Sequence, residues 1–301
     1  MGVGCSVFDF EGAPMSEETV IARPLDRRLL VKASLSAGFC AAISPVMSQV
    51  VATPADGLVV GEVKVPAGDA DIPAYRAMPD RGGSFPTVLV VHEVFGVHEH
   101  IKDICRRFAK LGYYAISAEL FARQGDAAAE PDMGKLMSTI VFKKPDAEVL
   151  SDLDASLAFA KSTGSADVQR AAVVGFCWGG RQVWLYAAHN PSLKAAVAWY
   201  GPLGPPYFGT EPPLRPTNPP DVVGDLKVPV LGLYGGVDSA IPLDQIKAMQ
   251  AKLKTAGEVS KINIYPDAGH GFFADYRPDY NRADAEASWS EATRWLREHG
   301  A

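Results

Sequence analysis

The sequence Gly-Phe-Cys-Trp-Gly-Gly at residues 175–180 constrains the fold more than any other part of the chain. An apolar run at residues 171–174 precedes it, and a helical pattern at residues 181–189 follows it. This order predicts a strand, a sharp turn and a helix. Glycines suit such a turn because strained backbone packed tightly between strand and helix leaves no room for side chains. We expect Cys177 to be exposed at the top of the sheet, beside the N-terminus of the helix.

A cysteine in that position can be a nucleophile. The helix dipole and any nearby imidazolium would stabilise its thiolate. The same motif also fits a buried structural cysteine beside packing glycines. The choice between these interpretations therefore depends on the partners that the rest of the chain supplies.

Composition narrows the function classes. The chain has 301 residues, of which 48% are hydrophobic, enough for one substantial core of the size common in α/β folds. The net charge is -6 without a long basic run, so we expect no nucleic-acid partner. No apolar stretch reaches the length of a membrane span, so we expect no stable transmembrane helix. The four cysteines lack zinc-like or disulfide-framework spacing, and we expect neither a metal nor a cofactor.

The N-terminal part of the chain has the features of an export signal. Arg27 and Arg28 precede a moderately apolar segment of small residues, and Lys32 follows closely. This resembles a twin-arginine signal. We predict an N-terminal extension over residues 1–52, cleavage between about 48 and 55, and a folded domain over 53–301. The mature protein would then be periplasmic; the alternative is an amphipathic N-terminal helix on a cytoplasmic protein.

Strands and helices alternate along the predicted domain. Apolar runs predict strands at 57–65, 72–78, 87–91, 113–117, 171–174, 195–199, 230–234 and 262–265. Helical spacing predicts helices at 99–111, 146–161, 181–189, 242–256 and 284–298. The alternation indicates an α/β fold with a mostly parallel central sheet, helices on both faces and an antiparallel N-terminal hairpin. Residues 202–225 are proline-rich and unpatterned, as expected of a lid, a binding surface or a surface loop.

Two later loops offer partners for Cys177. Asp238 follows the strand at 230–234, and His270 follows the strand at 262–265. A nucleophile, an acid and a histidine in this chain order form the triad of a nucleophile-elbow enzyme. We expect His270 to pair with or deprotonate Cys177, and Asp238 to orient the imidazole. Asp267, on the histidine loop itself, is the competing acid and is more typical of a turn cap.

An oxyanion formed during acyl transfer needs two backbone N–H donors. One belongs to Trp178, the residue after the nucleophile, and the other belongs to the loop after an earlier strand. The earlier loop here is at residues 92–96, directly after the strand at 87–91.

From about Gly57 to the C-terminus the chain resembles the dienelactone hydrolase family. Three motifs carry the resemblance: His92-Glu93-Val94-Phe95-Gly96, Gly175-Phe176-Cys177-Trp178-Gly179-Gly180 and Ala268-Gly269-His270-Gly271-Phe272. The resemblance implies an α/β-hydrolase fold. It also implies cofactor-free hydrolysis of a small ester or lactone through a cysteine acyl-enzyme.

The resemblance also assigns roles. Cys177 becomes the nucleophile, Asp238 the acid and His270 the base. Glu93 corresponds to a glutamate that contacts the resting thiol and shifts when substrate binds, and Val94 supplies the second oxyanion amide.

A substrate carboxylate is held by arginines in this family, and here the resemblance is incomplete. Arg123, in an Ala-Arg-Gln segment, corresponds to one of them. A serine and an arginine after the histidine are replaced by Gly271 and Ala274, and Arg277 lies nearby but out of register. We therefore expect weaker selectivity for carboxylate-bearing esters.

Other interpretations remain open. The same fold could cleave a thioester or another carboxylic ester, or it could serve as a non-catalytic binding protein. His92, Glu93, His98, Glu99 and His100 form a run that could suggest a metal site. It lacks H-E-x-x-H, and we expect His98 and His100 to point to different faces of a helix start. The physiological substrate and the oligomeric state are not defined by the sequence.

Overall fold

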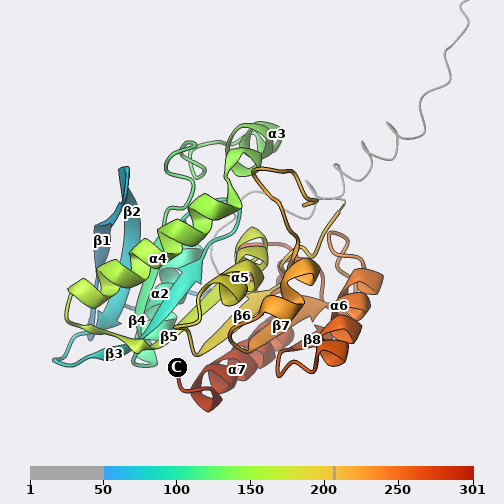
Figure 1. The fold of residues 1–301 in the computed structure, drawn as a ribbon. Helices are drawn as coiled ribbons and strands as arrows, with labels where there is room; N and C mark the ends of the chain where they lie inside the picture. The colour runs from blue at the N-terminus through green and yellow to red at the C-terminus, as the bar shows by residue number, and fades with distance from the viewer. Residues whose placement is uncertain (1–50, 206–207) are drawn as a thin grey trace, which may run out of the picture.

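The computed structural model describes residues 51–205 and 208–301 (Figure 1). Most of the predicted signal therefore lies outside the described residues. An eight-stranded sheet in the order β1-β2-β4-β3-β5-β6-β7-β8 runs through the molecule, with helices on both faces. No helix of these two ranges is both long and apolar enough to cross a membrane.

The elements agree closely with the predicted order. The strands are β1 Leu58–Ala67, β2 Ala70–Pro79, β3 Phe85–Val91, β4 Tyr114–Ala118, β5 Ala166–Phe176, β6 Ala195–Trp199, β7 Val230–Gly235 and β8 Lys261–Tyr265. The main helices are α2 Glu99–Lys110, α4 Asp146–Ser162, α5 Trp178–His189, α6 Leu243–Ala256 and α7 Arg282–Glu298. The chain has the predicted α/β-hydrolase fold.

Strand direction determines where the chemistry can be. β1 and β2 form the predicted antiparallel hairpin, and β2 is antiparallel to β4. From β4 to β8 all neighbours are parallel. The loops after β3, β5, β7 and β8 therefore leave from the same edge of the sheet. These are the loops that carry Glu93, Cys177, Asp238 and His270.

The helix layers on the two faces of the sheet determine which strand residues are buried. Every residue of β4 and β6 is buried because both faces of the sheet are covered, whereas β1 has a mostly alternating pattern. Helices α4 and α5 lie on the face nearer the viewer in Figure 1. Helices α2 and α7 lie on the other face, where the rings of Phe108 and Trp289 have centroids 4.6 Å apart.

Two segments are more ordered than the sequence pattern predicted. A helical stretch, α3 Met133–Lys135 with η1 Leu136–Ile140 and η2 Val141–Lys143, lies before α4. The 202–225 segment contains a 3-10 helix, η3 Pro219–Asp225, in which Asp221 accepts a hydrogen bond from the Asn218 N–H. The description of 202–225 as unpatterned was wrong there, because Asn218 and Pro219 are helix-start residues that periodicity alone does not detect.

Candidate active site

Cys177 lies in a sharp turn between β5 and α5. Its backbone has φ 52° and ψ -120°, a conformation that costs energy for any residue other than glycine. Two hydrogen bonds hold the turn in place. The Cys177 N–H donates to the Trp199 carbonyl at 3.1 Å, and its carbonyl accepts from the Arg181 N–H at 3.2 Å.

The glycines around Cys177 are required by close packing, as predicted. A Cβ at Gly175 would lie 2.5 Å from the Gly179 carbonyl oxygen, and one at Gly179 would lie 2.4 Å from the Val91 carbonyl oxygen. A Cβ at Gly180 would lie 2.5 Å from the Trp199 carbonyl oxygen. These neighbours are backbone atoms of α5 and of the ends of β3 and β6, which cannot move aside cheaply. The elbow sequence is thus a packing requirement as well as a chemical motif.

The structure brings together the three side chains that the sequence placed far apart. The His270 Nε2 atom lies 3.2 Å from the Cys177 Sγ atom, and the His270 Nδ1 atom lies 2.9 Å from Asp238 Oδ2. The other oxygen of Asp238 accepts hydrogen bonds from the Ala240 and Ile241 N–H groups. Asp267, the competing acid, is exposed. The carboxylate at His270 is that of Asp238.

Charge at the site favours a protonated imidazole. Burial opposes the charge on His270, but the Asp238 carboxylate and the Cys177 sulfur outweigh it and raise the pKa of His270 to about 10. His270 is therefore imidazolium at neutral pH in the resting protein. This imidazolium lies 3.2 Å from the Cys177 Sγ atom.

The sulfur is not open to solvent. Cys177 is fully buried, so the expectation of an exposed side chain was wrong. Sequence shows the turn but not the side chains that close over it. Tyr200 packs against the histidine partner of the sulfur, and its ring meets the His270 ring edge-on at 5.3 Å. A substrate reaches the sulfur only after neighbouring side chains move.

Glu93 lies in a buried polar cluster beside this site. Tyr276 donates a hydrogen bond to its Oε2 atom, and Arg277 lies 4.0 Å from its Oε1 atom. Burial alone would favour the neutral acid, but the Arg277 guanidinium outweighs it and lowers the pKa of Glu93. The sequence predicted a contact between Glu93 and the resting thiol, whereas the hydrogen bond to the sulfur comes from His270. The sequence did not reveal Tyr276 and Arg277 as partners of Glu93. Both come after the histidine motif, and neither occupies the position of the family's arginine, which is Ala274 here.

The two expected oxyanion donors occupy the predicted positions. Val94 lies in the loop after β3, and Trp178 is the first residue of α5. A first-turn N–H has no partner within its helix. Among the described residues, the backbone N–H groups of Val94 and Trp178 donate to no protein acceptor. Both remain available to an oxyanion.

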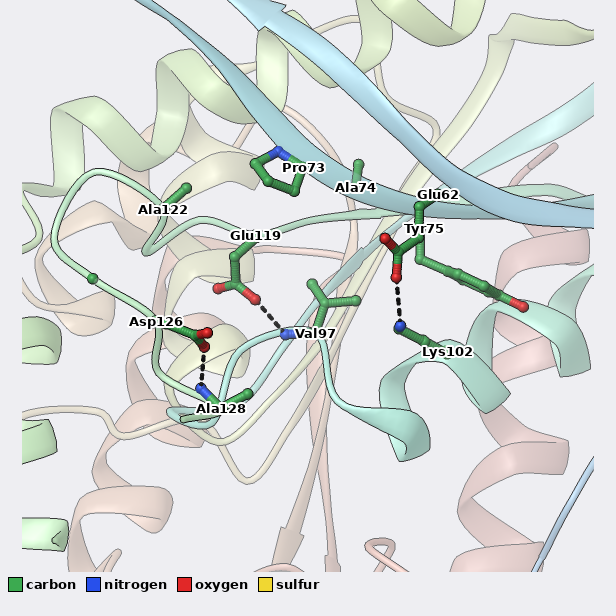
Figure 2. Close-up of a pocket in the computed structure, with 11 residues that line it drawn as sticks. Glu62, Pro73, Ala74, Tyr75, Val97, Lys102, Glu119, Ala122, Asp126 and Ala128 are labelled. Atoms are coloured by element: carbon green, nitrogen blue, oxygen red, sulfur yellow. Dashed lines mark hydrogen bonds and ion pairs between the residues drawn. The ribbon is translucent and has the colours of Figure 1, made fainter. Parts of the chain in front are cut away.

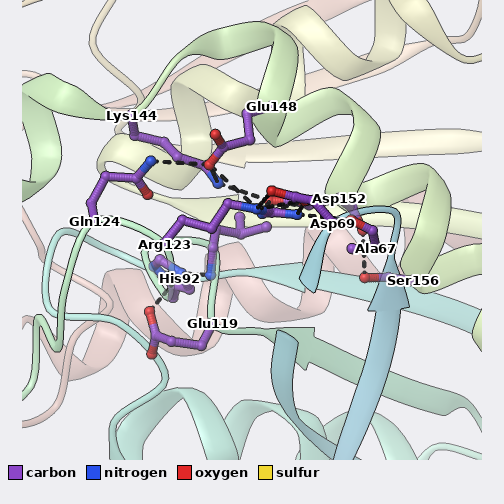
Figure 3. Close-up of polar contacts among 11 residues, drawn as sticks. Ala67, Asp69, His92, Glu119, Arg123, Gln124, Lys144, Glu148, Asp152 and Ser156 are labelled. Carbon is purple, nitrogen blue, oxygen red and sulfur yellow. Dashed lines mark hydrogen bonds and ion pairs between the residues drawn. The ribbon is translucent and has the colours of Figure 1, made fainter. Parts of the chain in front are cut away.

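Arg123 has partners that the sequence did not suggest (Figure 3). Its Nε and Nη2 atoms donate to Asp69, its Nη1 atom donates to Asp152, and Nη2 also donates to the Ala67 carbonyl. Lys144 joins the network through Asp152 at 2.8 Å. All three nitrogens of the guanidinium are thus engaged by protein oxygens. This geometry gives no support to Arg123 as a substrate anchor; it ties the β1–β2 turn to α4.

The histidines after Glu93 are arranged differently from the expectation. The His98 and His100 rings stack at 6.0 Å with an angle of 18°, so they do not point to different faces. His100 Nδ1 is 2.9 Å from Asp275, and burial, with His100, lowers the pKa of His98 to about 3. Within the described ranges, no group of three or more His, Cys, Asp or Glu side chains could hold a metal ion.

The sheet, the elbow and the loops that meet at one edge define an α/β-hydrolase. The model of the dienelactone hydrolase family matches residues 72–300, and the chain belongs to this family. A Methylorubrum extorquens protein with the provisional name carboxymethylenebutenolidase is 52% identical over 296 residues, which are 98% of this chain and 99% of the relative. An Escherichia coli protein with the same provisional name is 48% identical over 264 residues, 87% of this chain and 96% of the relative.

A solved structure agrees with the family. A crystal structure provisionally described as a dienelactone hydrolase, from Klebsiella pneumoniae subsp. pneumoniae, has a TM-score of 0.76 and 46% identity. It covers 80% of this chain and 98% of that chain. The protein is accordingly a hydrolase that acts on carboxylic esters or lactones.

Replacing Asp238 tests the electrostatics of the site. In Asp238→Asn the carboxylate that raises the pKa of His270 is lost, so this pKa should fall from about 10 toward the ordinary histidine value of about 6.5. In the parent, the stability that His270 contributes is fully present below the unfolded pKa and is lost as the pH rises through about 10. In the variant the folded and unfolded pKa values of His270 become nearly equal, so this contribution, and its loss between about pH 6.5 and pH 10, should largely disappear.

Histidine NMR titration and urea unfolding from pH 6 to pH 10 measure both effects. Asp267→Asn is the matched control, because it removes a carboxylate from the same region without touching His270. An equal fall of the His270 pKa in both variants would contradict the assignment of Asp238.

Proposed function

We propose that Cys177 attacks the carbonyl carbon of a small ester or lactone and forms an acyl-enzyme. A carbon–sulfur bond forms, and the carbonyl oxygen becomes an oxyanion that accepts hydrogen bonds from the Val94 and Trp178 N–H groups. Collapse of this intermediate breaks the carbon–oxygen bond. The His270 imidazolium donates its proton to the departing oxygen.

Hydrolysis of the acyl-enzyme reverses the roles. His270, now neutral, takes a proton from water while the water oxygen attacks the acyl carbon. The carbon–sulfur bond breaks, the acid leaves and the thiolate–imidazolium pair returns. Asp238 keeps the ring oriented and stabilises its charged form throughout. The observation that carries this proposal is the line of contacts from Asp238 through His270 to Cys177, at 2.9 Å and 3.2 Å.

Arg277, rather than Arg123, is the better candidate to hold a substrate carboxylate. Arg277 is buried beside Glu93 and lies over the Phe95 and Tyr276 rings at 5.7 and 5.8 Å. A substrate carboxylate that took over the place of Glu93 at this guanidinium would preserve the charge balance. Glu93 would then shift, as the family resemblance implies. The Arg123 guanidinium is already neutralised by two aspartates.

Two other functions are compatible with this site. A thioester, or another carboxylic ester, would pass through the same acyl-enzyme and would need the same three side chains. A binding protein would need none of them to react. A substrate panel that includes thioesters, p-nitrophenyl esters and lactones separates these alternatives.

Cys177→Ala should reduce ester turnover by on the order of 10,000-fold, because the nucleophile is gone. Cys105→Ala is the matched control and should remain active, since Cys105 is buried in α2. Iodoacetamide should label Cys177 faster than Cys105, because burial raises the pKa of the Cys105 thiol. Peptide mapping measures the labelling of Cys177 and Cys105 separately. Equal labelling, or undiminished turnover in Cys177→Ala, would refute the cysteine mechanism.

The two arginines can be compared by substrate charge. We expect Arg277→Met to lower kcat/KM for a carboxylate-bearing lactone roughly 10–100-fold more than for its neutral methyl ester. Arg123→Met should affect the two substrates equally. The ratio of the kcat/KM values for the two substrates is unaffected by a loss of active protein through reduced stability. Arg277→Lys provides a variant that keeps the charge. If the ratio of kcat/KM for the carboxylate-bearing lactone to that for its methyl ester falls in Arg123→Met alone, Arg123 and not Arg277 holds the substrate carboxylate.

We also propose that the protein is exported through a twin-arginine signal to the periplasm, on the strength of Arg27, Arg28 and the small apolar residues after them. The mature chain should begin between about 48 and 55. Intact mass measurement of the protein from a periplasmic fraction, with Arg27→Lys/Arg28→Lys as the export-blocked control, tests this. A full-length chain found only in the cytoplasm would exclude export.

A further inference from the structure

His92 is a fully buried histidine with no part in the mechanism above. It follows β3 and directly precedes Glu93. Its Nδ1 atom lies 2.6 Å from the Glu93 carbonyl oxygen, and its Nε2 atom lies 3.1 Å from the Leu120 backbone nitrogen. A backbone N–H can only donate, so Nε2 accepts and Nδ1 carries the ring proton. The imidazole therefore donates to the carbonyl of Glu93.

That hydrogen bond sets the direction of a neighbouring N–H. The Glu93 carbonyl and the Val94 N–H belong to the same peptide unit, which is planar and trans. The two groups therefore point in opposite directions. When His92 holds the carbonyl, it also aims the Val94 N–H away from itself. The Val94 N–H is one of the two proposed oxyanion donors.

The same ring touches the residue that supplies the other donor. The His92 and Trp178 rings stack at 5.5 Å with an angle of 16°. Phe121 packs against both, at 5.0 Å from His92 and 4.5 Å from Trp178. Packing of this kind fixes the rings relative to each other. One imidazole thus connects the loop after β3 to the first residue of α5.

Glu119 fixes the far end of the loop that carries Glu93 and Val94. Its Oε2 atom accepts a hydrogen bond from the Val97 N–H at 2.7 Å (Figure 2), and its Oε1 atom lies 3.5 Å from His92 Nε2 (Figure 3). Gly96 has φ 71°, and a Cβ there would lie 2.5 Å from Glu119 Oε2. Glu119 and Val97 line a cavity of about 480 Å³, and no member of the triad lines it.

The charge state of His92 supports the assigned tautomer. Burial lowers the pKa of His92, which keeps the ring neutral at working pH. A proton added at Nε2 would face the Leu120 N–H, so the backbone also disfavours the charged form. The Nδ1–H donor to Glu93 is therefore constant through the reaction.

We infer that His92 is a positioning residue for the oxyanion hole, holding the Val94 N–H by a hydrogen bond and the Trp178 backbone by ring stacking. This inference rests on the proposed function. His92 does not touch the sulfur or exchange protons with substrate. It acts by keeping two donors at fixed separation, which a water-accessible loop could not do.

His92→Phe keeps a flat ring against Trp178 but removes the hydrogen bond to Glu93. We expect kcat on a p-nitrophenyl ester to fall roughly 10–100-fold with little change in KM. The rate of Cys177 alkylation by iodoacetamide should be unchanged, because alkylation needs the thiolate but no oxyanion hole. His92→Gln, whose amide can still donate, should recover part of the lost kcat.

A spectroscopic readout accompanies the kinetics. An aryl trifluoromethyl ketone takes up the Cys177 thiolate, a carbon–sulfur bond forms, and the ketone oxygen becomes the oxyanion. Fluorine NMR should show this adduct at lower occupancy in His92→Phe than in the parent. His189→Phe is the matched control, because His189 pairs with Asp154 at the other end of α5.

The outcomes separate the two proposals. A parent that turns over no ester, thioester or lactone would refute the proposed function. An active parent whose kcat and adduct occupancy are unchanged in His92→Phe would refute the positioning role alone. Equal loss of alkylation and turnover in both His92→Phe and His92→Gln would also overturn it, because it would indicate general damage to the site.

Discussion

The contact between the Cys177 sulfur and the His270 ring is the interaction on which the rest of the structure depends. It joins two residues 93 positions apart in the chain and requires β5 and β8 to end at the same edge of the sheet. The parallel order of the strands, the strained turn and the glycines beneath it all serve this requirement.

Charges of alternating sign surround that contact. Asp238 lies behind His270, and Arg277 lies behind Glu93. Each buried charge is compensated by a neighbour, because an uncompensated charge in such a site would be neutralised or would destabilise the fold. Under the proposed function, the carboxylate of an anionic substrate replaces that of Glu93 at Arg277 instead of adding a new charge to the site.

Local patterns were sufficient to predict the fold and the convergence of the triad. The elbow sequence, the strand order and the loop positions of Asp238 and His270 are all properties of short segments. The burial of Cys177, the stacking of His98 on His100 and the partners of Arg123 were not predictable in this way. Each of these depends on side chains from segments distant in sequence, such as Asp69 and Asp152 around Arg123. Neither Asp69 nor Asp152 lies in a motif that would identify it as a partner of Arg123.

The closed position of the sulfur also affects the lifetime of the protein. A thiolate is the form that peroxide converts to sulfenic acid and that foreign thiols capture as mixed disulfides. In the resting molecule neither peroxide nor a foreign thiol can reach the Cys177 sulfur, because Cys177 has no solvent-accessible surface. Damage to the Cys177 sulfur is therefore limited by how often the neighbouring side chains move aside. The side chains that cover the Cys177 sulfur therefore also protect it from these reagents while they stay in place.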